Sequence, residues 1–199
     1  MPAGRENVMD NTLVLNREII GSKSISAVIG VMFFVLATAF GAYVRIPLPG
    51  TPVPMTLQTL FVALSGAVLG KRLGSVSQVS YIFLGAMGLP IFQGYGFGPA
   101  HMLGPTGGYL TGFIAASYLT GRLLEKETSN AYKIAASFIA GTIVLYGFGI
   151  AWLMTLYRIN FLNAVTIGLI PFLTAEAVKI FAASFIYRAV ADRSKNIFS

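Results

Sequence analysis

Glu176 and Lys179 stand three positions apart in the stretch PFLTAEAVKIF, residues 171–181, which is predominantly apolar. Side chains at this spacing lie on one face of a helix, so the two groups can pair with each other or bind one ligand together. Each charge facing lipid at a helix centre costs roughly 2.5–3.5 kcal/mol, so both must face the protein interior. Because a buried ion pair seldom offsets its desolvation, a ligand site is favoured over the alternative of a purely structural pair.

Other side chains that could do chemistry are scarce. The chain has no cysteine, which excludes disulfides, thiolate catalysis and cysteine-ligated metals. The single histidine, His101, has no cluster of carboxylates beside it, so we predict an ordinary loop residue and no metal site. The apolar runs hold no nucleophile with a histidine base and no paired carboxylates, and the glycine-rich segments lack the spacing of a nucleotide-binding loop. We therefore expect neither enzymatic activity nor a cofactor.

The composition of the 199-residue chain is that of a membrane protein. Hydrophobic residues make up 55% and charged residues only 11%, too few to cover a soluble domain of this size. The net charge of +7 could suggest a nucleic-acid partner, but the basic residues stand singly between apolar runs and form no basic face. We therefore expect contact with membrane lipid and none with nucleic acid.

Six apolar runs can supply the helices that position Glu176 and Lys179. They cover residues 25–44, 56–70, 76–89, 106–124, 135–157 and 164–191. A membrane span needs about 20 residues, so the second and third runs are short and must be completed by irregular backbone beside protein or a wet cavity. We predict an all-α membrane protein with a cytoplasmic tail or surface helix at 1–24, a six-helix domain at 25–191 and a cytoplasmic tail at 192–199.

The basic residues predict the orientation of these helices. Two of them, Arg45 and Arg158, fall on one side of the membrane, and Lys179 lies within it. The other eleven fall on the side of the termini: Arg5, Arg17, Lys23, Lys71, Arg72, Arg122, Lys126, Lys133, Arg188, Arg193 and Lys195. Since short cytoplasmic loops are enriched in Lys and Arg, both termini are predicted to be cytoplasmic.

Two long connections on the opposite side contain seven of the nine prolines. They join the first helix to the second and the third to the fourth. Proline stiffens a loop and glycine permits unusual turns, so we expect these connections to shape the mouth of a pocket, with plain turns between packed helices as the alternative.

Two further segments could contribute to such a pocket. Gln58, near the outer end of the second run, carries an amide that can reach a bound polar group. In GPTGGYLTG, residues 104–112, we expect Thr106 to cap a helix and Tyr109 to line a ligand wall, while the glycines let helices approach closely. The structural alternatives are an interfacial glutamine and a simple helix start.

Four motifs match one protein family in order and spacing. They are IPLPGTPVPMTLQTLF, SYIFLGAMGLPIF, GPTGGYLTGFIAA and the Glu176/Lys179 pair after Pro171. Together they resemble the BioY family, the biotin-specific substrate-binding components of energy-coupling factor transporters, over about residues 27–191. The resemblance implies six transmembrane helices in the cell membrane of a prokaryote and an outward pocket closed by the first and third loops. It also implies high-affinity biotin binding for uptake, with a transmembrane coupling protein and two ATPases as partners.

The resemblance places biotin at Glu176 and Lys179. Glu176 can accept the ureido N–H groups, and Lys179 can either donate to the ureido carbonyl or balance the valerate carboxylate. Gln93 and Phe92 are expected in the loop that closes over the ligand. Three aromatic residues are expected to pack against the apolar ring: Tyr81, Phe92 and Tyr109.

Small residues on the first helix of this family contact the coupling protein, often as Ala-x-x-x-Ala. This chain offers instead Ser22, Ser26, Gly30, Ala37 and Gly41.

Two other functions stay open on the sequence. One is a proton-coupled carrier of a small carboxylate with Glu176 as the relay, although no 3+3 internal repeat supports it. The other is a structural membrane subunit that binds no small molecule.

Overall fold

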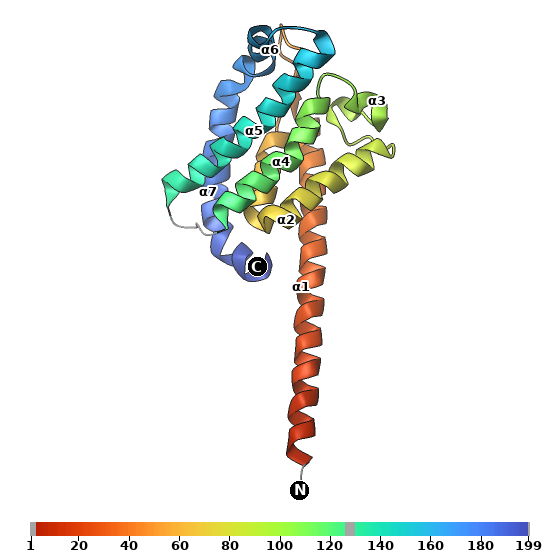
Figure 1. The fold of residues 1–199 in the computed structure, drawn as a ribbon, viewed down its shortest axis with the longest axis vertical. Helices are drawn as coiled ribbons and strands as arrows, with labels where there is room; N and C mark the ends of the chain where they lie inside the picture. Colours follow the sequence, from red (N-terminus) through yellow and green to blue (C-terminus); the bar gives the residue numbers. More distant parts are fainter. Residues whose placement is uncertain (1–2, 126–129, 199) are drawn as a thin grey trace.

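The computed structural model describes residues 3–125 and 130–198, with side chains from residue 23 onward. It is mostly helical (Figure 1): α1 (Ala3–Tyr43), α2 (Gln58–Ala86), α3 (Gly98–Met102), α4 (Gly107–Leu124), α5 (Ala131–Tyr157), α6 (Phe161–Gly168) and α7 (Leu173–Phe198). Two short strands, β1 (Arg45–Ile46) and β2 (Met55–Thr56), pair antiparallel, and 3₁₀ turns lie at η1 (Gln93–Tyr95) and η2 (Ile170–Phe172). By length and hydropathy, four helical stretches in the described part could cross a membrane: Lys23–Tyr43, Gln58–Ala86, Ala131–Tyr157 and Phe161–Phe198.

Helix α2 consists of two arms that fold back on each other at Gly70. This residue has φ 79° and ψ 172°, a conformation that glycine adopts readily and other residues avoid. The reversal brings Gln78 Nε2 within 3.0 Å of Ser65 Oγ, although thirteen residues of straight helix would span about 20 Å. The arms correspond to the predicted second and third runs. Together with α1, α4, α5 and α7 they give the predicted count of six long helices.

Close packing joins the arms of α2 to α4. A Cβ atom at Gly66 would clash with the backbone oxygen of Ser117, so only glycine allows this approach. A buried polar cluster adds hydrogen bonds at the same level: the Gln78 amide donates to the hydroxyls of Ser65, Ser77 and, at 3.5 Å, Thr38. Ser65 in turn shares a 2.9 Å hydrogen bond with Ser117. This cluster therefore connects α1, both arms of α2 and α4 within the core.

The predicted sixth run, residues 164–191, is two helices. Helix α6 ends at Gly168, and α7 begins at Leu173 after a turn that contains Pro171. A proline lacks the backbone N–H and its ring clashes with the preceding turn, so one continuous helix cannot form here. Pro171 thus marks the true start of the last long helix.

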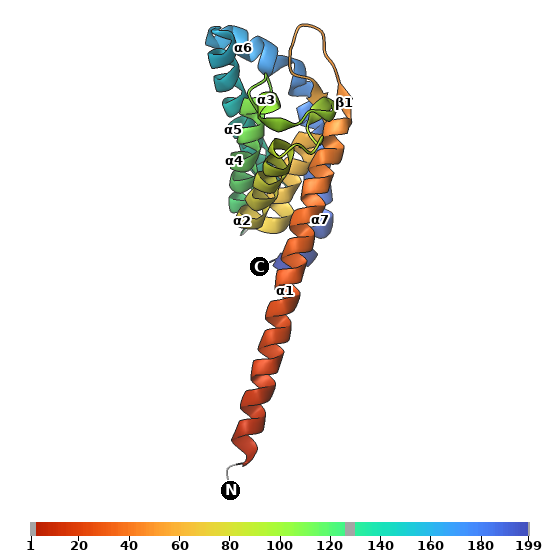
Figure 2. The same ribbon diagram turned by 90° about the vertical axis from the view of Figure 1, so that its right-hand side faces the viewer.

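The two ends of the bundle differ. The start of α1, the Gly70 turn and the end of α7 lie at one end, while α3, α6 and the β1–β2 connection lie at the other (Figures 1 and 2). This agrees with termini on a common side. The side of the membrane on which they lie stays a prediction, and three of the basic side chains used for it, Arg5, Arg17 and Lys126, are outside the described residues.

Large apolar side chains cover the outer faces of the long helices. On α1 and α7, for example, Leu36 is 65% exposed and Phe181 76% exposed. Such surfaces would be unstable in water and are expected where lipid surrounds a protein. Several polar residues are instead buried inside the bundle, among them Gln58, Gln78, Glu176 and Lys179.

Candidate functional site

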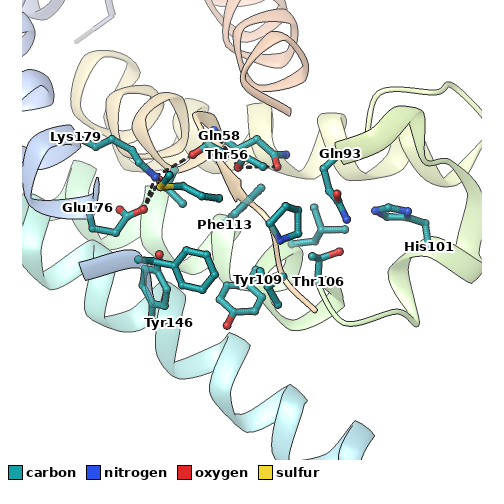
Figure 3. A pocket seen from close by; sticks show the side chains of 16 residues that line it. Thr56, Gln58, Gln93, His101, Thr106, Tyr109, Phe113, Tyr146, Glu176 and Lys179 are labelled. Carbon is teal, nitrogen blue, oxygen red and sulfur yellow. Dashed lines mark hydrogen bonds and ion pairs between the residues drawn. The ribbon is translucent and has the colours of Figure 1, made fainter. Parts of the chain in front are cut away.

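A cavity lies within the bundle near the end that carries the long connections (Figure 3). Its walls come from the β1–β2 connection, α2, η1, α3, α4, α5, η2 and α7. The lining residues are Val53, Pro54, Met55, Thr56, Gln58, Thr59, Gln93, His101, Thr106, Tyr109, Leu110, Phe113, Tyr146, Phe172, Glu176 and Lys179. The free space is about 40 Å³.

Glu176 and Lys179 form an ion pair at one end of this cavity. One carboxylate oxygen, Oε1, accepts hydrogen bonds from Lys179 and from the Thr59 hydroxyl, the latter at 2.9 Å. Lys179 also donates to Thr59 Oγ1 at 2.8 Å and to the Thr56 carbonyl at 2.9 Å. Both charged residues are at most 9% exposed, so they face the interior as predicted. All three ammonium hydrogens have acceptors, and a ligand must compete with these contacts.

The local fold explains why the pair sits at this depth. Because Pro171 delays the start of α7 to Leu173, Glu176 falls in the first turn of that helix, where the helix dipole stabilises a carboxylate. The three-residue spacing then places Lys179 above it on the same face. The Thr56 carbonyl belongs to strand β2, whose pairing with Arg45 of β1 fixes its direction.

Gln58 is held by a chain of hydrogen bonds. Its Oε1 accepts from Thr56 Oγ1 at 3.2 Å, and its Nε2 donates to the Tyr81 hydroxyl at 2.8 Å. The Tyr81 hydroxyl in turn donates a hydrogen bond to the Ile91 carbonyl at 2.9 Å. Tyr81 therefore stands behind Gln58 and orients its amide. It does not line the cavity, so its expected packing against a ligand ring is corrected to a positioning role.

Aromatic rings form one wall of the cavity. Tyr109 lines it as predicted, packs edge-on against Tyr146 at 5.7 Å between ring centres, and donates to the Gly168 carbonyl at 2.7 Å. Phe172 lies beside Tyr146 at 6.2 Å. Phe92, which was also expected on this wall, is fully buried behind the cavity and stacks on His101 at 5.2 Å. Of the three predicted aromatic residues, only Tyr109 borders the free space.

The structure brings further residues to the cavity that sequence reasoning missed. His101, predicted to be an ordinary loop residue, lies on α3 and lines the end opposite Glu176 (Figure 3). Thr106 stands at the start of α4, but its side chain makes no capping hydrogen bond and borders the cavity instead. Thr56 and Thr59 flank Gln58 in MTLQTL, and this polar cluster at the head of an apolar run was the one signal that could have found them.

Two of the five small residues proposed for partner contact, Gly30 and Gly41, lie against this chain itself. A Cβ atom at Gly30 would lie 2.7 Å from Leu69, and one at Gly41 would lie 2.9 Å from the backbone nitrogen of Gln58. These two glycines thus hold α1 against its own bundle. Ser26 and Ala37 are half-buried. The side chain of Ser22 lies outside the described residues.

Six long helices around a cavity with polar and aromatic walls define a helical membrane protein with an internal cavity. The sequence model of the BioY family matches residues 12–196, and the chain belongs to this family.

Similar proteins support the assignment of the chain to this family. The biotin transporter BioY of Thermotoga maritima is 39% identical over 153 residues, which cover 77% of this chain and 88% of the relative. A probable biotin transporter BioY of Pyrococcus horikoshii is 38% identical over 156 residues, covering 78% and 90%. The crystal structure of the S-component for biotin from an ECF-type ABC transporter matches with a TM-score of 0.78 and 25% identity, over 89% of this chain and 94% of that one.

These relatives are transporters, which supports the expectation that the chain is not an enzyme. With its apolar helices, the chain is a multi-pass prokaryotic membrane protein.

Proposed function

We propose that this chain binds biotin in the cavity and is the membrane subunit through which biotin is taken up. The observation that carries the proposal is the Glu176–Lys179 pair at the end of a partly aromatic cavity in a member of the BioY family. A ureido ring presents N–H donors beside a carbonyl acceptor. A carboxylate next to an ammonium group is the complementary arrangement.

This geometry favours one of the two roles left open for Lys179. Because Lys179 and Glu176 are in direct contact, a single ureido group can meet both: its N–H donates to the carboxylate and its carbonyl accepts from the ammonium. The apolar thiophane ring then lies against Tyr109, Phe113 and Phe172. The valerate carboxylate extends away from Lys179 toward the outer loops.

Binding requires movement of the cavity walls. The cavity lies inside the bundle behind the long connections, with only about 40 Å³ free, so biotin can enter only when part of the wall moves. Two walls are loops: Val53 and Pro54 from the β1–β2 connection, and Gln93 from the connection between α2 and α4. Their opening admits biotin and their return excludes water, so Gln93 keeps the closing role expected from the sequence.

In this proposal, separate protein subunits supply the energy for uptake. The sequence contains no nucleotide-binding loop, and the structural relative is one component of an ECF-type ABC transporter. A coupling subunit and two ATPase subunits supply the work. The exposed apolar face of α1, which includes Val28, Met32 and Leu36, is the surface left for a membrane partner, since Gly30 and Gly41 face inward. Both termini, with residues 1–24 and 192–199, lie in the cytoplasm.

Retention of radiolabelled biotin by the detergent-purified chain tests the proposal. Unlabelled biotin is expected to displace the label. Lipoic acid, which has a sulfur ring and a carboxylate tail but no ureido group, is expected to fail. Equal displacement by both would contradict the ureido assignment. Gradient-driven uptake by liposomes that contain this chain alone would favour the proton-coupled carrier with Glu176 as its relay.

A further inference from the structure

His101 occupies the end of the cavity farthest from the ion pair. It lies on α3, within the connection between α2 and α4, and its ring stacks on Phe92 at 5.2 Å with an angle of 21° between the planes. Phe92 is itself held edge-on by Tyr81 at 5.6 Å. Figure 3 shows His101 beside Gln93 and Thr106, with Glu176 and Lys179 across the cavity. The imidazole is therefore fixed by packing in a defined orientation.

The Nε2 atom of His101 is buried and has no hydrogen-bond partner among the described residues. Two other buried side-chain atoms share this property, Gln78 Oε1 and Thr120 Oγ1, but neither residue lines the cavity. Buried polar groups are nearly always hydrogen-bonded, so an unpartnered nitrogen at a cavity wall is available to a ligand atom.

We infer that His101 is a ligand-binding residue whose Nε2 binds the carboxylate end of the molecule held by Glu176 and Lys179. This assignment rests on the proposed function. Biotin carries its ureido group and its carboxylate at opposite ends of an apolar body, and the cavity carries polar groups at both ends with aromatic side chains between them. Thr106 and Gln93, which border the same end, can add hydrogen bonds to the second carboxylate oxygen.

The protonation state of His101 suits this contact. Burial lowers the pKa of His101 below its usual value, so the ring is neutral at neutral pH. A neutral imidazole carries one hydrogen, and with a carboxylate at Nε2 this hydrogen resides on Nε2, leaving Nδ1 as the acceptor beside Gly96. The site thus binds an anion through hydrogen bonds without placing another full charge in the cavity.

Arg45 is the alternative partner for the ligand carboxylate, because it is a basic residue near this end of the cavity. Its guanidinium lies against Gly94 of η1, where a Cβ atom would be 2.5 Å away. The residue is exposed and does not border the cavity. Arg45→Gln is therefore a matched control, since it removes a cation that packs against the connection holding His101 while leaving His101 in place.

The test is calorimetric titration of the full chain in detergent with biotin and with biotinamide, whose neutral amide replaces the carboxylate. His101→Phe keeps a ring for stacking on Phe92 and removes the donor. Loss of one hydrogen bond to a charged group should weaken biotin at least about tenfold in this variant. Biotinamide, whose neutral carbonyl makes a weaker hydrogen bond, should be weakened clearly less than biotin. His101→Gln, which retains an N–H, should recover part of the loss, and Arg45→Gln should change neither ligand.

Melting curves of the same preparations exclude unfolding as the cause. Equal weakening of both ligands in His101→Phe, or unchanged affinity for biotin, overturns the carboxylate assignment while the proposed function stands. A wild-type chain that binds neither ligand overturns the proposed function, and this assignment with it. If Arg45→Gln weakens the affinity for biotin more than His101→Phe does, the carboxylate binds Arg45 instead, and the inference is overturned.

Discussion

The substitution Glu176→Gln separates a ligand site from a structural ion pair. The glutamine keeps the side-chain volume and one oxygen that can still accept from Lys179 and Thr59, but it removes the negative charge and turns an N–H group toward the ureido donors. Lys179 retains its bonds to Thr59 Oγ1 and the Thr56 carbonyl. The chain should therefore fold, while the ligand loses at least one charged hydrogen bond.

The expected magnitude follows from that lost bond. Hydrogen bonds to charged groups contribute roughly 1.5–3 kcal/mol, so the affinity for biotin should fall at least about tenfold. If the pair serves structure alone, breaking it leaves Lys179 as a buried charge without its anion, which costs about 3–5 kcal/mol of stability and little affinity. Titration calorimetry and thermal melting of one detergent preparation measure both quantities.

A matched control is available at Glu125, another acidic residue paired with a lysine. Glu125→Gln breaks the 2.8 Å bridge to Lys71 at the far end of the bundle, where the Glu125 side chain is 38% exposed. Surface pairs contribute about 0–1 kcal/mol, so both affinity and melting temperature should stay close to wild type. A Glu176→Gln variant with unchanged affinity and a lowered melting temperature would refute the ligand role of this carboxylate.

Three further predictions concern topology, energy and packing. A reporter fused to the C-terminus should be cytoplasmic, as the eleven-to-two division of basic residues requires, and an external signal would overturn the orientation. The purified chain should hydrolyse no ATP, and biotin accumulation should need partner proteins; activity of the chain alone would contradict this. Gln78→Leu should lower stability by about 1–2 kcal/mol in a melting experiment, because Gln78 donates to hydroxyls on α1 and α2, while biotin affinity stays unchanged. A loss of affinity without a loss of stability would refute that structural role.

Local sequence signals were sufficient to predict the long helices and the buried pair. Apolar runs marked the positions of all six, although the last run, residues 164–191, was predicted as one helix and is divided at Pro171. Because a charged side chain facing lipid is costly, the sequence alone predicts that Glu176 and Lys179 face inward. These inferences succeed because each depends on a few neighbouring residues and on the membrane as solvent.

Contacts between distant segments could not be predicted in the same way. The bond between Gln58 and Tyr81 depends on how the two arms of α2 pack after Gly70, and no local pattern encodes that register. His101 reaches the cavity because a five-residue helix forms inside a connection rich in proline and glycine, where apolar periodicity gives no signal. Gly30 was read as a partner contact because its spacing permits close approach, and spacing alone does not say which helix approaches.

The central claim is that this chain holds biotin between its buried ion pair and its outer loops. Native mass spectrometry of the chain, purified in detergent from cells supplied with biotin, measures this directly. The account predicts one bound biotin per wild-type chain and little or none on Glu176→Gln, with Glu125→Gln resembling wild type. A wild-type chain that carries no biotin even after incubation with an excess of it, or equal occupancy in wild type and Glu176→Gln, would contradict the account.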